Sequence, residues 1–172
     1  MIRSFLENEG KKGVHALLII DIDNFKTIND SQGHLFGDSV LASIAAVIGA
    51  CFRITDIVGR IGGDEFVVFL KNVRSKSNIQ EKARQVCQAF RQLRMQDGRK
   101  AAISGSIGIA LCEHGNMGYE KLFQMADNAL YSAKKRGKNR YDFYREGMKM
   151  PSLPCSVSKI DSDGEQQTVE TP

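Results

Sequence analysis

A continuous apolar run, Val14–Ile20, ends at the acidic residue Asp21 and constrains the fold of this chain more than any other segment. The run is short and contains β-branched valine and isoleucine, so it predicts a strand rather than a helix. Strands that are apolar throughout are typically buried on both faces. The run is therefore expected to be a central strand of a sheet.

The rest of the chain alternates helix-like and strand-like patterns. An apolar stripe from Phe36 to Cys51 predicts a helix that begins near Asp38, whose carboxylate is expected to cap the helix or to complement its dipole. Gly62-Gly63 predicts the tight turn of a β-hairpin. The other expected elements are the hairpin strands 56–61 and 66–70, a helix over 77–95, a strand over 102–111, a helix over 119–136 and a strand over 141–144.

The order β-α-β-β-α-β-α-β predicts an α/β (α+β) sandwich of the ferredoxin-like type. Its central sheet is expected to be mostly antiparallel, with about five strands and with helices packed on it. The folded domain is expected over residues 1–147. Residues 148–172 contain all three prolines and are rich in Ser, Asp, Glu, Gln and Thr, so they are expected to be a disordered tail.

Composition and charge exclude several classes of protein. The 172 residues carry a net charge of +4 without a dense basic stripe, so nucleic acid is not expected as a partner. No apolar run approaches the about 18–20 residues of a membrane span, and no signal peptide is evident, so no membrane contact is expected. The four cysteines form no C-x-x-C pair and are expected to be reduced thiols of a cytoplasmic protein: Cys51, Cys87, Cys112 and Cys155.

Two acidic sites stand at the edges of predicted strands. Asp21-Ile22-Asp23 follows the apolar run, and Asp64-Glu65 follows the glycine turn. If the first strand lies beside the hairpin, Asp21 and Asp64 converge, and the backbone carbonyl of Ile22 adds a third hard oxygen ligand suited to Mg²⁺. The glycines at 62 and 63 would let a phosphate or a base approach the backbone closely. The alternative is a plain hairpin turn and a plain strand end.

The segment that follows Asp21 is rich in polar side chains. Guanine presents an acceptor, O6, and the donors N1–H and 2-amino along one edge. An Asn amide with an Asp carboxylate, here Asn29 and Asp38, is complementary to that edge. Lys26 could meet a phosphate as a point charge. The alternatives are that Asn29 and Asp38 are turn and cap residues, that Lys26 is solvated and that His34 stabilises a loop.

Several motifs occur in a fixed order over about residues 3–144. They are Asp21-Ile22-Asp23-Asn24-Phe25-Lys26, Asn29-Asp30, Gly33-His34, Gly37-Asp38, Arg60, Gly62-Gly63-Asp64-Glu65-Phe66, Ser106-Ile107-Gly108 and Ala126-Asp127-Asn128-Ala129-Leu130-Tyr131-Ser132-Ala133-Lys134. Together they resemble the GGDEF domain family, the diguanylate cyclases. The resemblance implies that family's fold, which is related to nucleotidyl cyclases and polymerase palms.

The resemblance implies a bacterial signalling enzyme that joins two GTP molecules into cyclic di-GMP and releases two pyrophosphates. It assigns catalysis to Asp64 as general base, Glu65 and Lys26, and Mg²⁺ or Mn²⁺ to Asp21, Asp64 and the carbonyl of Ile22. It assigns substrate binding to Asn29, His34, Asp38, Gly62, Gly63, Lys134 and Lys138. Because one domain binds one GTP, catalysis is expected to need a homodimer.

Arg53 and Asp56 form an R-x-x-D pattern ahead of Gly62. In the GGDEF family this spacing marks an inhibitory site for cyclic di-GMP, so the resemblance implies feedback by the product. Arginine can grip guanine or phosphate with two hydrogen bonds, and aspartate can accept from the guanine edge. The alternative is a surface ion pair of little energetic weight.

The chain departs from the family pattern at its start and at one lysine. The family usually opens with D-x-L-T-G-L-x-N-R, of which Met1-Ile2-Arg3 remains, so we expect an N-terminally truncated domain that lacks a sensor or receiver domain. Lys138 stands where arginine is usual, which keeps the positive charge but loses the planar guanidinium group that can form two parallel hydrogen bonds.

Two alternatives to an active cyclase stay open. One is a catalytically silent module that binds GTP or cyclic di-GMP as a receptor or only dimerises. The other is a related cyclase with an altered choice of base. The intact motif from Gly62 to Phe66 favours the active enzyme over the silent module.

Overall fold

The computed structural model describes residues 1–10, 12–94, 103–113 and 117–148. Within these ranges the strands form one mixed sheet in the order β2-β3-β1-β4-β5, antiparallel except for the pair β4–β5. This architecture confirms the expected sandwich with a mostly antiparallel sheet. The elements are α1 (Ile2–Asn8), β1 (Val14–Ile22), α2 (Phe25–Gln32), α3 (His34–Cys51), β2 (Ile57–Gly62), β3 (Glu65–Leu70), α4 (Lys76–Gln92), β4 (Gly105–Glu113), α5 (Tyr119–Lys135) and β5 (Tyr141–Phe143).

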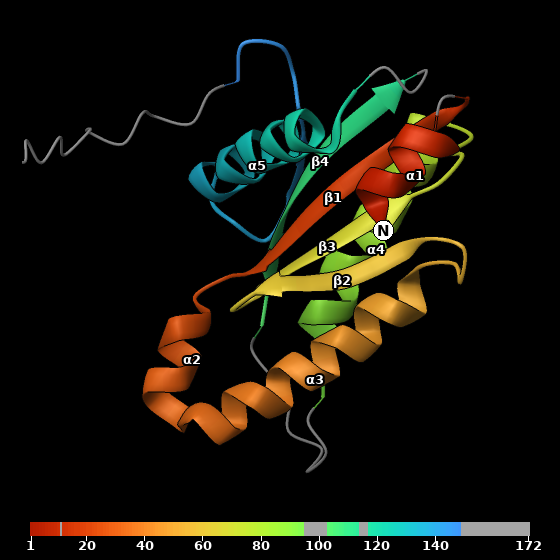
Figure 1. Ribbon diagram of the computed structural model, residues 1–172. Coiled ribbons are helices and arrows are strands. Elements are labelled where there is room, and N and C mark those ends of the chain that lie inside the picture. The colour runs from red at the N-terminus through yellow and green to blue at the C-terminus, as the bar shows by residue number, and fades with distance from the viewer. Residues whose placement is uncertain (11, 95–102, 114–116, 149–172) are drawn as a thin grey trace, which may run out of the picture.

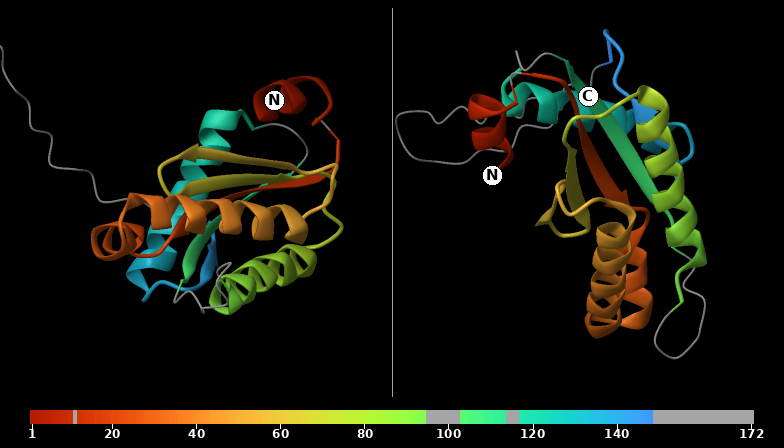
Figure 2. Two further views of the ribbon diagram at one scale, coloured as in Figure 1. Left: turned by 90° about the horizontal axis from the view of Figure 1, so that it is seen from below. Right: turned by 90° about the vertical axis from the view of Figure 1, so that its right-hand side faces the viewer.

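Helices cover both faces of the sheet and give the domain three layers (Figure 1, Figure 2). β1 lies at the centre of the sheet and is buried from His15 to Ile22. Leu18 and Ile20 belong to the core under α2, α3 and α4, whereas Leu17 and Ile19 belong to the core under α1 and α5. Both faces of β1 are therefore covered, which explains its unbroken apolar sequence.

The segment after β1 differs from the sequence prediction in two ways. Residues Phe25–Gln32 form the helix α2, where the pattern predicts only a connection; Phe25 is its one buried residue, so no apolar stripe reveals it. α3 begins at His34 with Gly33 as its N-cap, so the prediction that Asp38 caps this helix is wrong. Because Leu35 in the first turn is 86% exposed, the buried stripe of α3 starts later than the helix itself.

The hairpin turn lies one residue further along than predicted. Gly62 pairs with Glu65 across the hairpin, so Gly63 and Asp64 form the turn. Gly63 adopts a φ of +39°, a conformation that favours glycine. The other predicted elements are confirmed with small shifts of their ends. The predicted tail lies outside the described residues from 149 on, as does Cys155.

α3 is the one described helix that is long and apolar enough to cross a membrane, with a mean hydropathy of 1.6 over its 18 residues. The expectation that no segment approaches this length is therefore wrong. In the fold, however, Val40, Ile44 and Ile48 of α3 are completely buried in the core beneath the sheet. Core helices meet the same criteria of length and hydropathy, and α3 packs one face against the core, with 28% of its residues buried.

Asp142 on β5 is a buried carboxylate that ties the end of α5 to the sheet. It accepts hydrogen bonds from Ser132 Oγ at 2.8 Å and Arg136 Nη1 at 2.9 Å, and Arg145 Nη2 lies 3.6 Å away. Burial raises the pKa of Asp142, but these hydrogen bonds and the two guanidinium charges together bring it below the ordinary value. Folding is therefore coupled to the ionised form of Asp142.

Asp142→Asn is expected to lower the free energy of unfolding at pH 7 by about 2 kcal/mol, because hydrogen bonds to a charged group are lost. A lowered pKa stabilises the fold above the unfolded-state value of about 3.9, and this contribution disappears as the pH falls through the folded-state value. Urea unfolding at pH 7 and at pH 3 should therefore show a difference between parent and variant that shrinks in acid. A difference that stays constant, or an equal loss in the exposed control Glu7→Gln, would contradict this linkage.

Candidate functional site

The two acidic segments meet because β1 and β3 are antiparallel neighbours. Asp21 lies directly opposite Glu65 in the register, and the amide N–H of Ile22 donates to the carbonyl of Asp64 at 3.3 Å. In Figure 1 the end of β1, the hairpin turn and α2 lie at the same end of the sheet. The expected convergence of the segments around Asp21 and Asp64 is thus present in the fold.

Asp21 and Glu65 concentrate negative charge at this end of the sheet. The pKa of Asp21 is raised above its ordinary value, mainly by burial and also by the charge of Asp64, although Lys134 lowers it in part. Burial and the charge of Asp21 likewise raise the pKa of Glu65. The Nζ of Lys134, on α5, lies 2.7 Å from Oδ2 of Asp21, whose side chain is only 9% exposed. One ammonium group therefore faces a cluster of carboxylates that retains an affinity for further positive charge.

Asp23 belongs to the same sequence motif but has a different environment. Its carboxylate accepts hydrogen bonds from Ser104 Oγ at 2.6 Å, Ser106 Oγ at 2.7 Å and the amide N–H of Asn139 at 2.9 Å. These three donors satisfy a carboxylate that is 5% exposed. Asp23 thus holds β1 and β4 to the turn after α5, and Asp21 is the carboxylate of this motif that faces the site.

The hairpin turn is braced from β2 and open on its outer side. Arg60 donates from Nε and Nη2 to the carbonyl oxygen of Gly63 at 2.9 and 2.6 Å. A Cβ added at Gly62 or at Gly63 would meet nothing within 4 Å. The space above both glycines is therefore free for a ligand, as the sequence predicts.

The start of α2 offers donors for an anion. No side chain caps this helix within the described ranges, and its N-cap, Asn24, is left-handed with a φ of 57°. Lys138 Nζ donates to Asn24 Oδ1 at 2.6 Å, and Lys26 is exposed on the first turn. Free amide groups at a helix N-terminus together with lysine side chains suit a phosphate.

The two residues expected to read the base, Asn29 and Asp38, and the expected substrate-binding residue His34 lie on α2 and α3. Asn29 is half-buried on α2, whereas His34 and Asp38 are exposed on α3. Asp38 lines a groove of about 460 Å³ between α3 and β2, together with Arg60 and Phe66. His34 does not line this groove. The structure therefore brings Asp38 close to the braced hairpin and leaves His34 at the start of α3.

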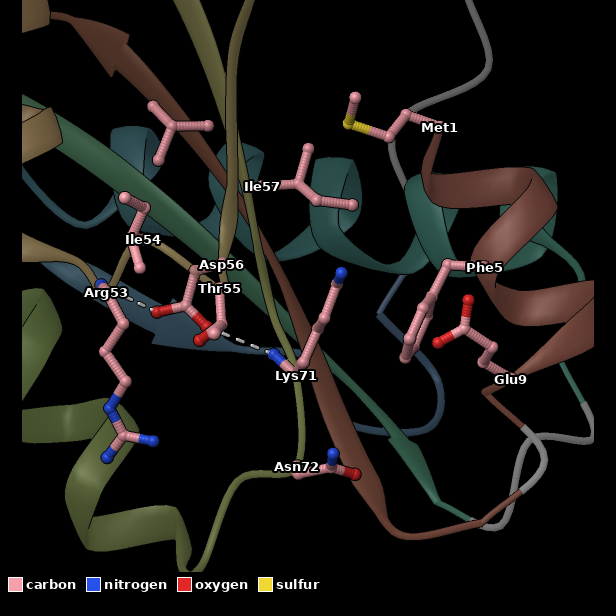
Figure 3. Close-up of a pocket in the computed structure, with 11 residues that line it drawn as sticks. Met1, Phe5, Glu9, Arg53, Ile54, Thr55, Asp56, Ile57, Lys71 and Asn72 are labelled. Atoms are coloured by element: carbon pink, nitrogen blue, oxygen red, sulfur yellow. Dashed lines mark hydrogen bonds between the residues drawn. The ribbon is translucent and has the colours of Figure 1, made fainter.

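Arg53 and Asp56 lie in the turn between α3 and β2, which joins the end of β2 opposite the hairpin. Asp56 accepts hydrogen bonds from the amide N–H of Arg53 at 3.0 Å and of Lys71 at 3.3 Å. The turn lines a cleft of about 620 Å³ that reaches α1 through Phe5, and in Figure 3 Arg53 and Phe5 lie on opposite sides of this cleft. Asp56 therefore orders the turn, and the exposed guanidinium remains the group that can grip a ligand.

Two residues that contribute to the site have no role predicted from the sequence. Arg60 braces the hairpin turn. Asp127, on α5, is half-buried; burial raises its pKa, and its charge contributes to the raised pKa of Glu65. Arg60 and Asp127 both belong to the motifs that resemble the GGDEF family, but neither motif by itself indicates which atoms these residues contact.

A palm-like sheet with paired carboxylates at a glycine hairpin defines a class of nucleotide-processing domain, and comparison with known proteins identifies the family. Residues 2–140 match the family described as "Diguanylate cyclase, GGDEF domain". The chain belongs to the GGDEF family.

Known proteins that resemble the chain in sequence or in structure also contain GGDEF domains or are diguanylate cyclases. The chain is 37% identical over 134 residues to the diguanylate cyclase DosC of Escherichia coli, covering 77% of this chain and 29% of DosC. The GGDEF domain of YfiN (TpbB) from Pseudomonas aeruginosa superposes with a TM-score of 0.76 at 34% identity, covering 83% of this chain and 90% of that one. The GGDEF domain of DgcB from Caulobacter crescentus, solved with cyclic di-GMP, has a TM-score of 0.72 at 29% identity, covering 83% and 84%. The chain thus spans less than a third of the length of DosC.

Proposed function

We propose that the chain is an active diguanylate cyclase, which condenses two GTP molecules into cyclic di-GMP and two pyrophosphates. The observation that carries this proposal is the pairing of β1 with β3, which places Asp21 opposite Glu65 and next to Asp64 with Lys134 as counter-ion. Family membership and the intact Gly62–Phe66 motif support it. We also propose a bacterial cytoplasmic enzyme, because its proposed substrate is GTP, with biofilm formation as a downstream process that cyclic di-GMP signalling would serve.

The donor chemistry at the site supports a divalent cation held by two carboxylates and one carbonyl oxygen; no group of three His, Cys, Asp or Glu side chains suited to a metal occurs among the described residues. The donor atoms are hard oxygens, and Asp21 already holds a cationic group at 2.7 Å. Asp21, Asp64 and the carbonyl oxygen of Ile22 would hold Mg²⁺ or Mn²⁺. When bound, the cation draws charge from the α-phosphate oxygens and lowers the pKa of the attacking hydroxyl group.

The side chains around this centre would bind and orient GTP. The amides at the start of α2, with Lys26, Lys134 and Lys138, neutralise the phosphates, while the open backbone at Gly62 and Gly63 admits them closely. Asn29 and Asp38 read the guanine, and His34 in the same segment of the chain adds a further polar side chain. Asp64, supported by Glu65, accepts the proton of the 3′-hydroxyl group that attacks the second GTP. Positioning and electrostatic stabilisation supply most of the rate enhancement.

Each domain supplies one GTP site, so the reaction needs two copies face to face, and we propose a homodimer as the catalytic unit. The relatives are longer proteins, which fits an additional sensor or receiver domain that controls this pairing.

Incubation of the full chain with GTP and Mg²⁺, followed by chromatography of the products, tests the proposed function. Cyclic di-GMP and pyrophosphate are expected in a ratio of one to two, with an activity per molecule that rises with protein concentration. GTP binding without turnover at any concentration would instead support the silent module. Cyclic products from other nucleotides at comparable rates would support an altered choice of base.

The turn at Arg53 is proposed as the inhibitory site for the product. Arg53→Ala is expected to raise the concentration of cyclic di-GMP needed for half-inhibition at least about 10-fold, because charge-assisted hydrogen bonds to the ligand are lost. Arg53 contacts Asp56 through its backbone N–H, so the substitution leaves the turn in place. Unchanged inhibition, or the same loss in the exposed α5 control Lys121→Ala, would remove Arg53 from this role.

A further inference from the structure

Gly37 lies buried near the start of α3, where this helix follows directly after α2. A Cβ built on Gly37 would lie 1.8 Å from Oδ1 and 3.0 Å from Cγ of Asn29, and 3.3 Å from Cζ of Phe25. Because Gly37 lies within a regular helix, its own backbone conformation does not require glycine. The position of the Asn29 side chain is what requires glycine at residue 37, because a larger residue there would collide with Oδ1 of Asn29.

The same contact determines which end of the Asn29 carboxamide faces inward. Oδ1 is buried and accepts no hydrogen bond from the described residues. A hydrogen atom of Gly37 takes the direction of the absent Cβ, so a Cα–H group points at Oδ1. Such groups are weak donors, which suit a carbonyl oxygen and not an NH₂ group. Nδ2 of Asn29 is therefore the end that faces away from Gly37.

We propose that Gly37 is a positioning residue for purine selection, because it leaves room for Oδ1 and so presents Nδ2 of Asn29 to the nucleotide base. This inference rests on the proposed function. An NH₂ donor favours a purine with a carbonyl oxygen at position 6 and disfavours adenine, which carries an amino donor there. Asp38, the next residue in the chain, adds an exposed carboxylate acceptor. A donor and an acceptor side by side match the edge of guanine.

Calorimetric titration of the full chain with GTP and with ATP tests this role. Gly37→Ala is expected to weaken GTP binding about 10-fold and to reduce the preference for GTP over ATP, as Asn29→Ala should. Adding Gly37→Ala to Asn29→Ala is expected to cause little further loss of GTP affinity, because the Asn29 atoms that the new Cβ would meet are gone and only the contact with Phe25 Cζ at 3.3 Å remains. Gly49→Ala is the matched control, since a Cβ at Gly49 on the same helix meets nothing within 4 Å.

Unchanged affinity and selectivity in Gly37→Ala would overturn the proposal, as would an equal loss in the Asn29→Ala background. Urea unfolding of the same proteins separates this failure from failure of the proposed function, because the contact is tested without nucleotide. Destabilisation by Gly37→Ala must shrink to a small remainder in the double variant, where only Phe25 Cζ at 3.3 Å still meets the new Cβ, and its persistence at full size overturns the positioning role. A parent that binds no GTP while passing this unfolding test contradicts the proposed function, and with it the inferred selectivity.

Discussion

Asp64→Asn is expected to reduce cyclic di-GMP formation by about 10³-fold while the domain remains folded. Asparagine keeps the size of the side chain but removes the charge that would hold the cation and accept the proton of the attacking hydroxyl group. Asp64 is in the hairpin turn and its backbone carbonyl accepts from Ile22, a contact that the substitution preserves. The measurement is the initial rate of product formation with GTP and Mg²⁺, with folding checked by thermal unfolding.

Asp30→Asn provides the control, because it removes a carboxylate from the exposed face of α2 without touching the hairpin. The control should retain the rate of the parent. An Asp64→Asn protein that keeps more than about a tenth of the parent rate would rule out both proposed roles of Asp64, since either one is worth more than this.

Gly108→Ala is expected to destabilise the fold strongly, and more than Asp142→Asn does. A Cβ at Gly108 on β4 would lie 2.0 Å from the carbonyl oxygen of Ala126 and 2.3 Å from the amide nitrogen of Leu130, both in the backbone of α5. Backbone atoms of a packed helix cannot move aside as a flexible side chain can, so the helix must shift as a whole. We expect a loss of about 3 kcal/mol and a decrease in Tm of about 10 °C.

Gly59→Ala is the matched strand control, because a Cβ there would meet only Val67 Cγ1 at 3.8 Å, an ordinary contact. Thermal unfolding of both variants tests the close packing of α5 on β4 at Gly108. Equal Tm values for the two variants would contradict this packing. Because α5 carries Lys134, a folded Gly108→Ala protein should also lose activity through displacement of the ammonium group from Asp21.

The sequence predicts the elements that bury a regular apolar pattern. The run before Asp21 indicates the central strand, and the apolar stripes of α4 and α5 indicate their positions, because these segments face the core along their whole length. α2 escapes prediction since it buries only Phe25 and is held by its neighbours rather than by its own pattern. The start of α3 escapes for a related reason, because its first turn is largely exposed.

In the candidate site, too, some features are predictable from the sequence and others depend on the tertiary fold. Sequence motifs indicate Asp21, Asp64 and Glu65, and the sheet register confirms that their segments meet. The local Asp-x-Asp pattern, without the family resemblance, does not distinguish Asp21, which faces Lys134, from Asp23, which three donors satisfy. This distinction depends on residues more than 80 positions away along the chain, so it follows from the tertiary fold and not from local pattern.

Binding of Mn²⁺ in the presence of a non-hydrolysable GTP analogue, followed by electron paramagnetic resonance, tests most directly whether Asp21 and Asp64 share one cation. Asp21→Asn and Asp64→Asn are each expected to weaken binding at least about 10-fold, and the double variant is expected to lose much less than the product of the two effects, because both residues serve one site. Single variants that bind Mn²⁺ as tightly as the parent, or losses that multiply in the double variant, would contradict the shared site on which the proposed mechanism depends.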